Sequence, residues 1–158
     1  IKKYERGRRL VEDVFVQPCD APIVVIGMGR VGMGAYRALE LQKTNQAWGL
    51  DADKDKIAWL NSRGVQSYFG DAEDIDFWEN VNVEKIDLVL LAVPSIQDCK
   101  TITKLLKKTQ YEGKIAAIAR FDDEREELQE LGIDKVFNFY SEAGVGFAEE
   151  SIALIGHN

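Results

Sequence analysis

The sequence predicts an α/β fold in which helices flank a doubly wound, mostly parallel sheet of six strands. Short apolar runs alternate with amphipathic stretches about six times along the 158 residues. One run, residues 86–93, is almost continuously apolar, which is typical of a central parallel strand covered on both faces. Parallel neighbours need crossover connections of about a dozen residues or more, and helices usually supply them. A chain of this length is expected to form one domain around one core.

The first half of the chain is expected to supply three strands, each followed by a helix. Residues 23–26 are four β-branched residues in a row, as in a strand buried on both faces. The stretch after them repeats at helical spacing, at Val31, Ala35, Ala38 and Gln42. The other elements expected here are strands at 47–50 and 65–69 and helices at 54–61 and about 73–79.

The second half repeats the alternation. After the strand at 86–93, helical spacing is marked by Cys99, Ile102, Leu105, Leu106 and Thr109. Strands are then expected at 115–119 and 136–139, and a helix at 122–131 that ends at Gly132. A final helix has one apolar face, formed by Ala148, Ile152 and Ile155.

Residues 1–21 are expected to be a linker or docking arm, and residues 22–158 to be the domain proper. Pro18 and Pro22 bracket Asp20 in a turn-like segment, and the residues before it are charged and weakly periodic. The chain begins at Ile1 rather than at Met, so we expect a piece of a longer protein.

Composition and charge exclude several classes of protein. The net charge is −7, from 20 basic and 27 acidic residues, whereas nucleic-acid binders usually show a basic excess. The longest apolar run, residues 88–94, is far short of the roughly 20 residues that cross a bilayer. Two cysteines, Cys19 and Cys99, lie in different contexts and suggest neither a disulfide framework nor a metal site. A cytoplasmic location fits these features, with no nucleic acid as partner.

A glycine-rich motif follows the first expected strand and opens the first helix: Gly27-Met28-Gly29-Arg30-Val31-Gly32. Gly27 permits a tight turn, Gly29 lets a pyrophosphate approach the backbone, and Gly32 lets the helix lie close to the sheet. The N–H groups and the dipole of the helix then face the negative charge of the ligand. This context predicts a Rossmann-type nucleotide site; the alternative is a tight strand–helix turn without a ligand.

An acid at the end of the second strand extends this site. Asp51 follows the glycine motif by about 20 residues, where a carboxylate accepts the hydroxyls of an adenosine ribose. The same carboxylate repels a 2′-phosphate, so NADP is disfavoured. Asp53 either shares the ribose or caps the helix that begins at Lys54, and we favour capping.

Three segments together resemble the RCK (TrkA-N) nucleotide-binding domain. They are residues 26–32 with Arg30 inside the glycine motif, residues 50–53, and Phe69-Gly70-Asp71-Ala72. The resemblance covers about residues 23–155 and implies an N-terminal RCK lobe. It also implies that Arg30 contacts the phosphates, that Asp71 and Ala72 border the adenine, and that Ala92 and Val93 pass beneath the cofactor. The candidate cofactor-binding residues are Gly27, Met28, Gly29, Arg30, Val31, Gly32, Asp51, Ala52, Asp53, Asp71, Ala72, Ala92, Val93 and Arg120.

Three of the residues implied by the resemblance have an ordinary structural explanation as well. Asp71 is either a ligand contact or the cap of a helix at Glu73. Arg120 lies near phosphate or a partner, or pairs with the acids that follow it. Glu142 lies near the nucleotide or a cation at a subunit interface, or is simply a first-turn acid of its helix.

The function implied by the resemblance is regulatory. Such domains bind NAD(H) or AMP/ATP and gate potassium channels or monovalent cation:proton antiporters through ligand-dependent changes in a homodimer. They lie at the inner face of the membrane, beside a membrane-embedded transport domain. Members that sense glutathione carry a basic residue where this chain has Asp122, so glutathione binding is not expected.

The sequence offers no catalytic group, so we expect no enzyme activity. No tyrosine is followed by lysine four positions later, and the single histidine is His157, near the end of the chain. Neither Cys99 nor Lys100 has a partner that would activate it. The alternatives are a fragment of an NAD-dependent oxidoreductase and an interaction module that binds no ligand.

Overall fold

The computed structural model describes residues 21–156, so that most of the predicted N-terminal arm and His157 lie outside the described residues. It contains one six-stranded sheet in the order β3-β2-β1-β4-β5-β6, and all five neighbouring pairs are parallel. The strands are β1 (Ile23–Ile26), β2 (Ala47–Asp51), β3 (Ser67–Phe69), β4 (Leu88–Leu91), β5 (Lys114–Ala119) and β6 (Lys135–Asn138). The doubly wound α/β fold is therefore confirmed, and the sheet is entirely rather than mostly parallel.

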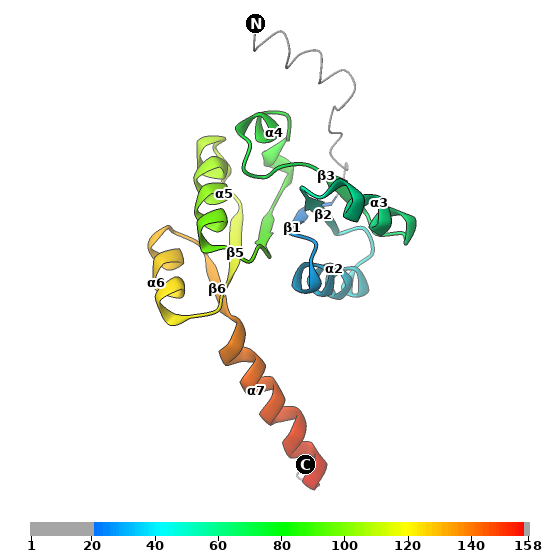
Figure 1. Ribbon diagram of the computed structural model, residues 1–158, viewed down its shortest axis with the longest axis vertical. Helices are drawn as coiled ribbons and strands as arrows, with labels where there is room; N and C mark the ends of the chain where they lie inside the picture. The colour runs from blue at the N-terminus through cyan, green and yellow to red at the C-terminus, as the bar shows by residue number, and fades with distance from the viewer. Residues whose placement is uncertain (1–20, 157–158) are drawn as a thin grey trace, which may run out of the picture.

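Helices cover both faces of this sheet, and one helix leaves it (Figure 1). They are α2 (Arg30–Gln42), α3 (Lys54–Ser62), α4 (Ile75–Glu79), α5 (Ile96–Lys108), α6 (Asp122–Glu130) and α7 (Phe139–Ile152), with short 3-10 turns η1 (Val83–Lys85) and η2 (Ala153–Ile155). Buried side chains of α2 and α3 share one core cluster, and those of α4, α5 and α6 share the other. The helices thus change face where β1 meets β4, which is the switch point of a doubly wound sheet.

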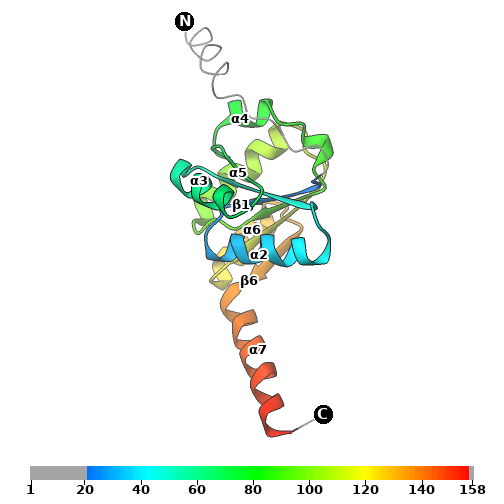
Figure 2. The ribbon, with the colours of Figure 1, turned by 90° about the vertical axis from the view of Figure 1, so that its right-hand side faces the viewer.

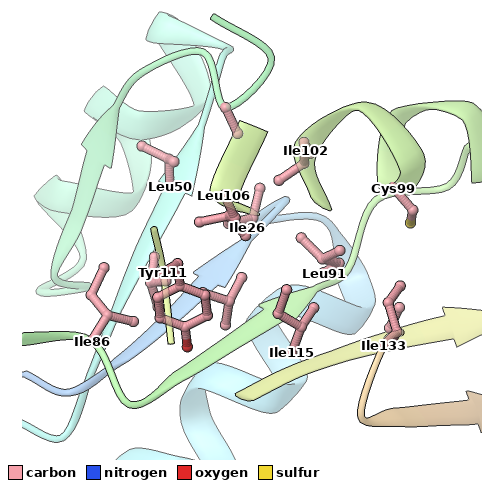
Figure 3. Close-up of a cluster of buried hydrophobic side chains, with 14 of the residues drawn as sticks. Ile26, Leu50, Ile86, Leu91, Cys99, Ile102, Leu106, Tyr111, Ile115 and Ile133 are labelled. Atoms are coloured by element: carbon pink, nitrogen blue, oxygen red, sulfur yellow. The ribbon is translucent and has the colours of Figure 1, made fainter. Parts of the chain in front are cut away.

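The two core clusters explain why β1 is apolar at every position. Val24 and Ile26 belong to the cluster beneath α5, whereas Val25 belongs to the cluster beneath α2. Successive side chains of a strand point to opposite faces, so a strand covered on both faces has no polar side. Figure 3 shows the part of the first cluster around Ile26, Leu91 and Leu106.

Several element boundaries differ from those predicted. The third strand begins at Ser67 rather than at residue 65, and the strand expected at 86–93 is confined to Leu88–Leu91. The helix expected from about residue 73 begins at Ile75, because Asp74 caps it by accepting the N–H of Asp76. Such shifts occur where local caps and turns, rather than apolar pattern, decide the end of an element.

The last strand and the last helix also meet earlier than expected. Phe139, predicted to end the strand, is instead the first residue of α7, because Asn138 Oδ1 accepts the N–H of Ser141 and caps the helix. At the other end of the domain, Ala21 is buried in the core, one residue before the predicted boundary.

Helix α7 projects away from the body of the domain (Figures 1 and 2). None of its residues is buried in the described part of the chain. Residues 21–156 do not cover its predicted apolar face: Ile152 and Ile155 are exposed, and so is Phe147, which has 75% of its surface accessible. No helix among residues 21–156 is long and apolar enough to cross a bilayer.

Candidate functional site

The glycine motif forms the turn between β1 and α2 in the way its spacing predicts. Gly27 has φ +93°, and a Cβ at this position would lie 2.8 Å from the Ala92 carbonyl oxygen. A Cβ on Gly32 would lie 1.8 Å from the Gly27 carbonyl oxygen. By contrast, a Cβ on Gly29 would have no neighbour within 4 Å. Gly27 and Gly32 are therefore required by the fold, whereas Gly29 leaves open space beside the loop.

The start of α2 is electrically suited to an anion. Gly29 is the N-cap residue, no side chain caps the helix, and its first turn contains no acidic residue. Uncapped N–H groups and the helix dipole favour negative charge at this end. Helices α3, α5 and α7 each begin with a side chain that accepts a backbone N–H. Helix α6 has no side-chain cap either, but its first turn contains three acidic residues, whereas that of α2 contains none.

Asp51, the last residue of β2, ties this loop to the next strand. Its Oδ2 accepts the N–H of Met28 at 2.8 Å, and its Oδ1 accepts the N–H of Asp53 at 2.9 Å. The ammonium group of Lys56 lies 3.3 Å from Oδ2. The side chain of Asp51 is 13% exposed and that of Lys56 is 38% exposed. The acid predicted to hold a ribose is thus already oriented, and it is paired with a cation that the sequence reasoning missed.

A cavity of about 390 Å³ opens beside Asp51, and we call it the β2-side cavity. Its walls come from the carboxyl ends of β1 to β4, where ligands bind in open α/β sheets. Eight predicted site residues line it: Gly27, Gly29, Asp51, Ala52, Asp71, Ala72, Ala92 and Val93. Residues far apart in sequence therefore meet around one space.

A second cavity of about 260 Å³ lies across the switch point, and we call it the β5-side cavity. Three further predicted residues line it: Arg30, Val31 and Arg120. The two cavities share Gly29, Ala92, Val93 and Pro94 as lining residues. The β5-side cavity also reaches Phe139, the first residue of α7. The two spaces together could hold the two halves of a dinucleotide.

Three predicted residues line neither cavity. The Met28 side chain is buried and packs against Gly49, so that only its backbone belongs to the loop. Gly32 serves the close contact with Gly27 described above. Asp53 caps α3 by accepting the N–H groups of Asp55 and Lys56, each at 3.1 Å, as the capping alternative predicted.

The acidic residues around the β2-side cavity include two that the sequence reasoning missed. Asp71 accepts the N–H of Glu73 at 2.9 Å, while Asp74 is the cap of α4, so Asp71 does not cap that helix. Glu73 and Asp98 also line the cavity. Partial burial, followed by the nearby Asp98 carboxylate, raises the pKa of Glu73. Asp98 lies in α5, and no sequence spacing connects it with residues 71–73.

Arg120 occupies the position expected for a basic group at the end of β5. Its guanidinium Nη1 donates to the Pro94 carbonyl oxygen at 2.7 Å, which holds the side chain across the β5-side cavity. Its backbone N–H donates to Glu124 Oε1, so the contact with the following acids is made through the main chain. Glu142 lies in the first turn of α7 and lines neither cavity.

Two kinds of reactive group can be compared with the structure, a metal centre and a reactive cysteine. Among the described residues, no cluster of histidine, cysteine and acidic side chains could hold a metal ion. Cys99 is buried, and burial raises the pKa of its thiol to about 11, far from the range of a reactive cysteine.

Comparisons with known proteins agree with this geometry. The profile of the TrkA-N domain matches residues 23–139. Glutathione-regulated potassium-efflux system protein KefC from Cronobacter sakazakii (strain ATCC BAA-894) is 30% identical over 111 residues, which make up 70% of this chain and 18% of that protein. The chain thus spans less than a fifth of the length of this curated relative.

Solved structures share the fold at lower sequence identity. The NAD(P)-binding domain of an exopolyphosphatase-related protein from Archaeoglobus fulgidus has a TM-score of 0.77 at 21% identity, covering 84% of this chain and 98% of that chain. The Kef CTD of Shewanella denitrificans, in AMP bound form, has a TM-score of 0.69 at 22% identity, covering 86% and 82%.

Proposed function

The chain belongs to the TrkA-N domain family, and on this premise we propose that it is a regulatory domain that binds an adenine nucleotide. The observation that carries the proposal is the β2-side cavity, where the open side of Gly29, the uncapped start of α2 and the Asp51 carboxylate meet. A phosphate beside Gly29 would receive N–H donors from the loop. A ribose beside Asp51 would donate a hydroxyl to the carboxylate.

The nucleotide is AMP or ATP, or NAD(H). A mononucleotide needs only the β2-side cavity for its adenosine. A dinucleotide would continue past Gly29 and Pro94 into the β5-side cavity, where Arg30 and Arg120 supply positive charge. Two relatives support this choice, since one is described as an NAD(P)-binding domain and the other as bound to AMP.

The regulated protein is a potassium channel or a monovalent cation:proton antiporter, with this domain at the inner face of the membrane. KefC, a potassium-efflux system protein, supports this assignment. The domain pairs with a second copy through α7, whose apolar side chains Val145, Phe147 and Ile152 are exposed in the part of the chain that the structure describes. A ligand in the β5-side cavity would contact Phe139 and so bias the direction of α7. Ligand-dependent pairing of this kind would then gate the membrane-embedded transport domain.

Isothermal titration calorimetry tests the binding step. AMP, ATP, NAD and NADH are titrated into the wild type and into Asp51→Asn, which keeps the shape and an acceptor for Met28 but removes the charge and the acceptor for the N–H of Asp53. Asp55→Asn is the matched control, because Asp55 is an exposed acid of α3 that lines neither cavity. We expect Asp51→Asn to weaken binding by about tenfold and Asp55→Asn to leave it unchanged.

Two results would contradict the proposal. Absence of binding to every nucleotide in the panel would favour a module that serves interactions alone. Hydride transfer from bound NADH to an added carbonyl substrate would instead identify a fragment of an oxidoreductase.

A further inference from the structure

The ion pair between Asp51 and Lys56 changes what the ribose end of the β2-side cavity can accept. We propose that Lys56 is a specificity-determining residue that lets this site bind adenine nucleotides carrying a phosphate on the ribose 2′-oxygen. The inference rests on the proposed nucleotide-binding function and revises one expectation from the sequence, that Asp51 excludes such nucleotides.

The hydrogen bonds of Asp51 limit its capacity for a ribose. A carboxylate offers about four acceptor sites on its two oxygens. Met28 and Lys56 occupy those of Oδ2, and Asp53 occupies one of Oδ1. One favourable position therefore remains, enough for one ribose hydroxyl. The second hydroxyl, or a group attached to it, meets the Lys56 ammonium, which has two further N–H donors.

Lys56 makes the ribose end of the cavity less negative than it would be with Asp51 alone. Lys56 is the only cation among the described residues that line the β2-side cavity. Its contact with Asp51 offsets the charge that would repel a phosphate, and its ammonium offers charge-assisted hydrogen bonds to phosphate oxygens. The other acids lining the cavity, Asp71, Glu73 and Asp98, come from the segment after β3 and from α5.

Lys54 provides a matched comparison within the same helix. Its ammonium lies 5.1 Å from the centre of the Phe69 ring, and it does not line the β2-side cavity. Lys54 and Lys56 have the same charge and lie two positions apart in the first turns of α3. If Lys56 acted only through long-range positive charge, substituting either lysine would weaken phosphate binding to the same extent. If Lys56 contacts the phosphate directly, only its own substitution would weaken binding.

The experiment uses two probes that differ by a single phosphate, AMP and adenosine 2′,5′-bisphosphate. Both are titrated calorimetrically into the wild type, Lys56→Gln and Lys54→Gln, and thermal unfolding checks that each variant is folded. In the wild type we expect the two affinities to lie within about tenfold of each other. In Lys56→Gln we expect the bisphosphate to bind about tenfold or more weakly, while AMP changes less than about threefold. Lys54→Gln should leave the ratio of affinities unchanged.

The outcomes separate this inference from the proposed function. If AMP binds the wild type but Lys56→Gln leaves the ratio of affinities unchanged, Lys56 does not determine specificity and the inference is wrong. The same conclusion follows if Lys54→Gln lowers the ratio as much as Lys56→Gln does. If neither probe nor any other adenine nucleotide binds the wild type, the proposed function fails and this inference fails with it.

Discussion

Helices α5 and α7 have almost the same length, 13 and 14 residues, but opposite relations to the rest of the chain. Helix α5 buries Cys99, Ile102, Thr103 and Leu106 against the sheet. Helix α7 buries none of its residues in the described part of the chain, although it contains several large apolar side chains. Apolar side chains of α5 therefore stabilise this fold, while those of α7 are available to another surface.

The largest expected effect is on stability and contrasts the two helices directly. Leu106→Ala removes a fully buried side chain of α5 and should lower the free energy of unfolding by about 2–5 kcal/mol. Ile152→Ala on α7 should change it by less than about 0.5 kcal/mol at concentrations where the chain is monomeric. Urea unfolding followed by circular dichroism measures both, and equal losses would show that α7 packs on its own domain.

A second contrast concerns glycines in helices. Gly32→Ala places a Cβ against the Gly27 carbonyl and should destabilise the domain by about 1–3 kcal/mol. Gly144→Ala on α7 meets no atom within 4 Å and should stabilise it by up to about 1 kcal/mol, since alanine favours helices. Thermal unfolding measures whether each substitution lowers or raises the melting temperature. A stable Gly32→Ala variant would mean that the loop is less tightly packed than its geometry indicates.

The exposed apolar side chains of α7 are expected to form the interface of a homodimer. Phe147→Ser should weaken a homodimer by about tenfold or more without destabilising the monomer, because this side chain is exposed to solvent on α7. Leu41→Ser is the control, since Leu41 is also a highly exposed apolar residue but lies on α2. Sedimentation velocity over a range of concentrations measures the effect. The same response from both variants would contradict an interface on α7.

The smallest expected effect is a pH dependence at the rim of the β2-side cavity, where α5 brings Asp98 near Glu73. The pKa of Glu73 is raised above its ordinary value of 4.5 by partial burial and by Asp98. Glu73 therefore ionises less readily in the folded state than in the unfolded state. The protonated side chain contributes stability at low pH, and this contribution is lost as the pH rises above about 4.5.

Relative to Glu73→Gln, the wild type should therefore lose stability between acidic and neutral pH. Urea midpoints at several pH values measure this difference, and Glu79→Gln on α4 controls for the general loss of a negative charge. An identical pH profile for wild type and Glu73→Gln would show that folding does not raise the pKa of Glu73.

Much of the site could be predicted because it depends on local sequence. The glycine motif needs only a strand before it and a helix after it, and Asp51 needs only the end of the next strand. Lys56 was also within reach of such reasoning. With Asp53 as the cap of α3, Lys56 is in the first turn, where side chains lean back towards the start of the helix and hence towards Asp51.

Asp98, by contrast, could not be assigned to the site from the sequence. It comes from a helix on the far side of the switch point, and its distance to Glu73 depends on how α5 packs on the sheet. The Pro94 carbonyl, which accepts a hydrogen bond from the Arg120 guanidinium, could not be predicted from the sequence either. Contacts of this kind follow from strand order and helix packing rather than from spacing along the chain.

The sequence by itself determined the alternation of strands and helices, the turn at Gly27 and the position of Asp51 at the end of β2. These depend on apolar periodicity and on backbone conformations that few residues allow. The tertiary structure decided which acids gather around the β2-side cavity, how Lys56 offsets Asp51, and that α7 leaves the body of the domain. An apolar face on a helix predicts that the face is covered, but only the packed structure shows whether the cover lies in the same chain.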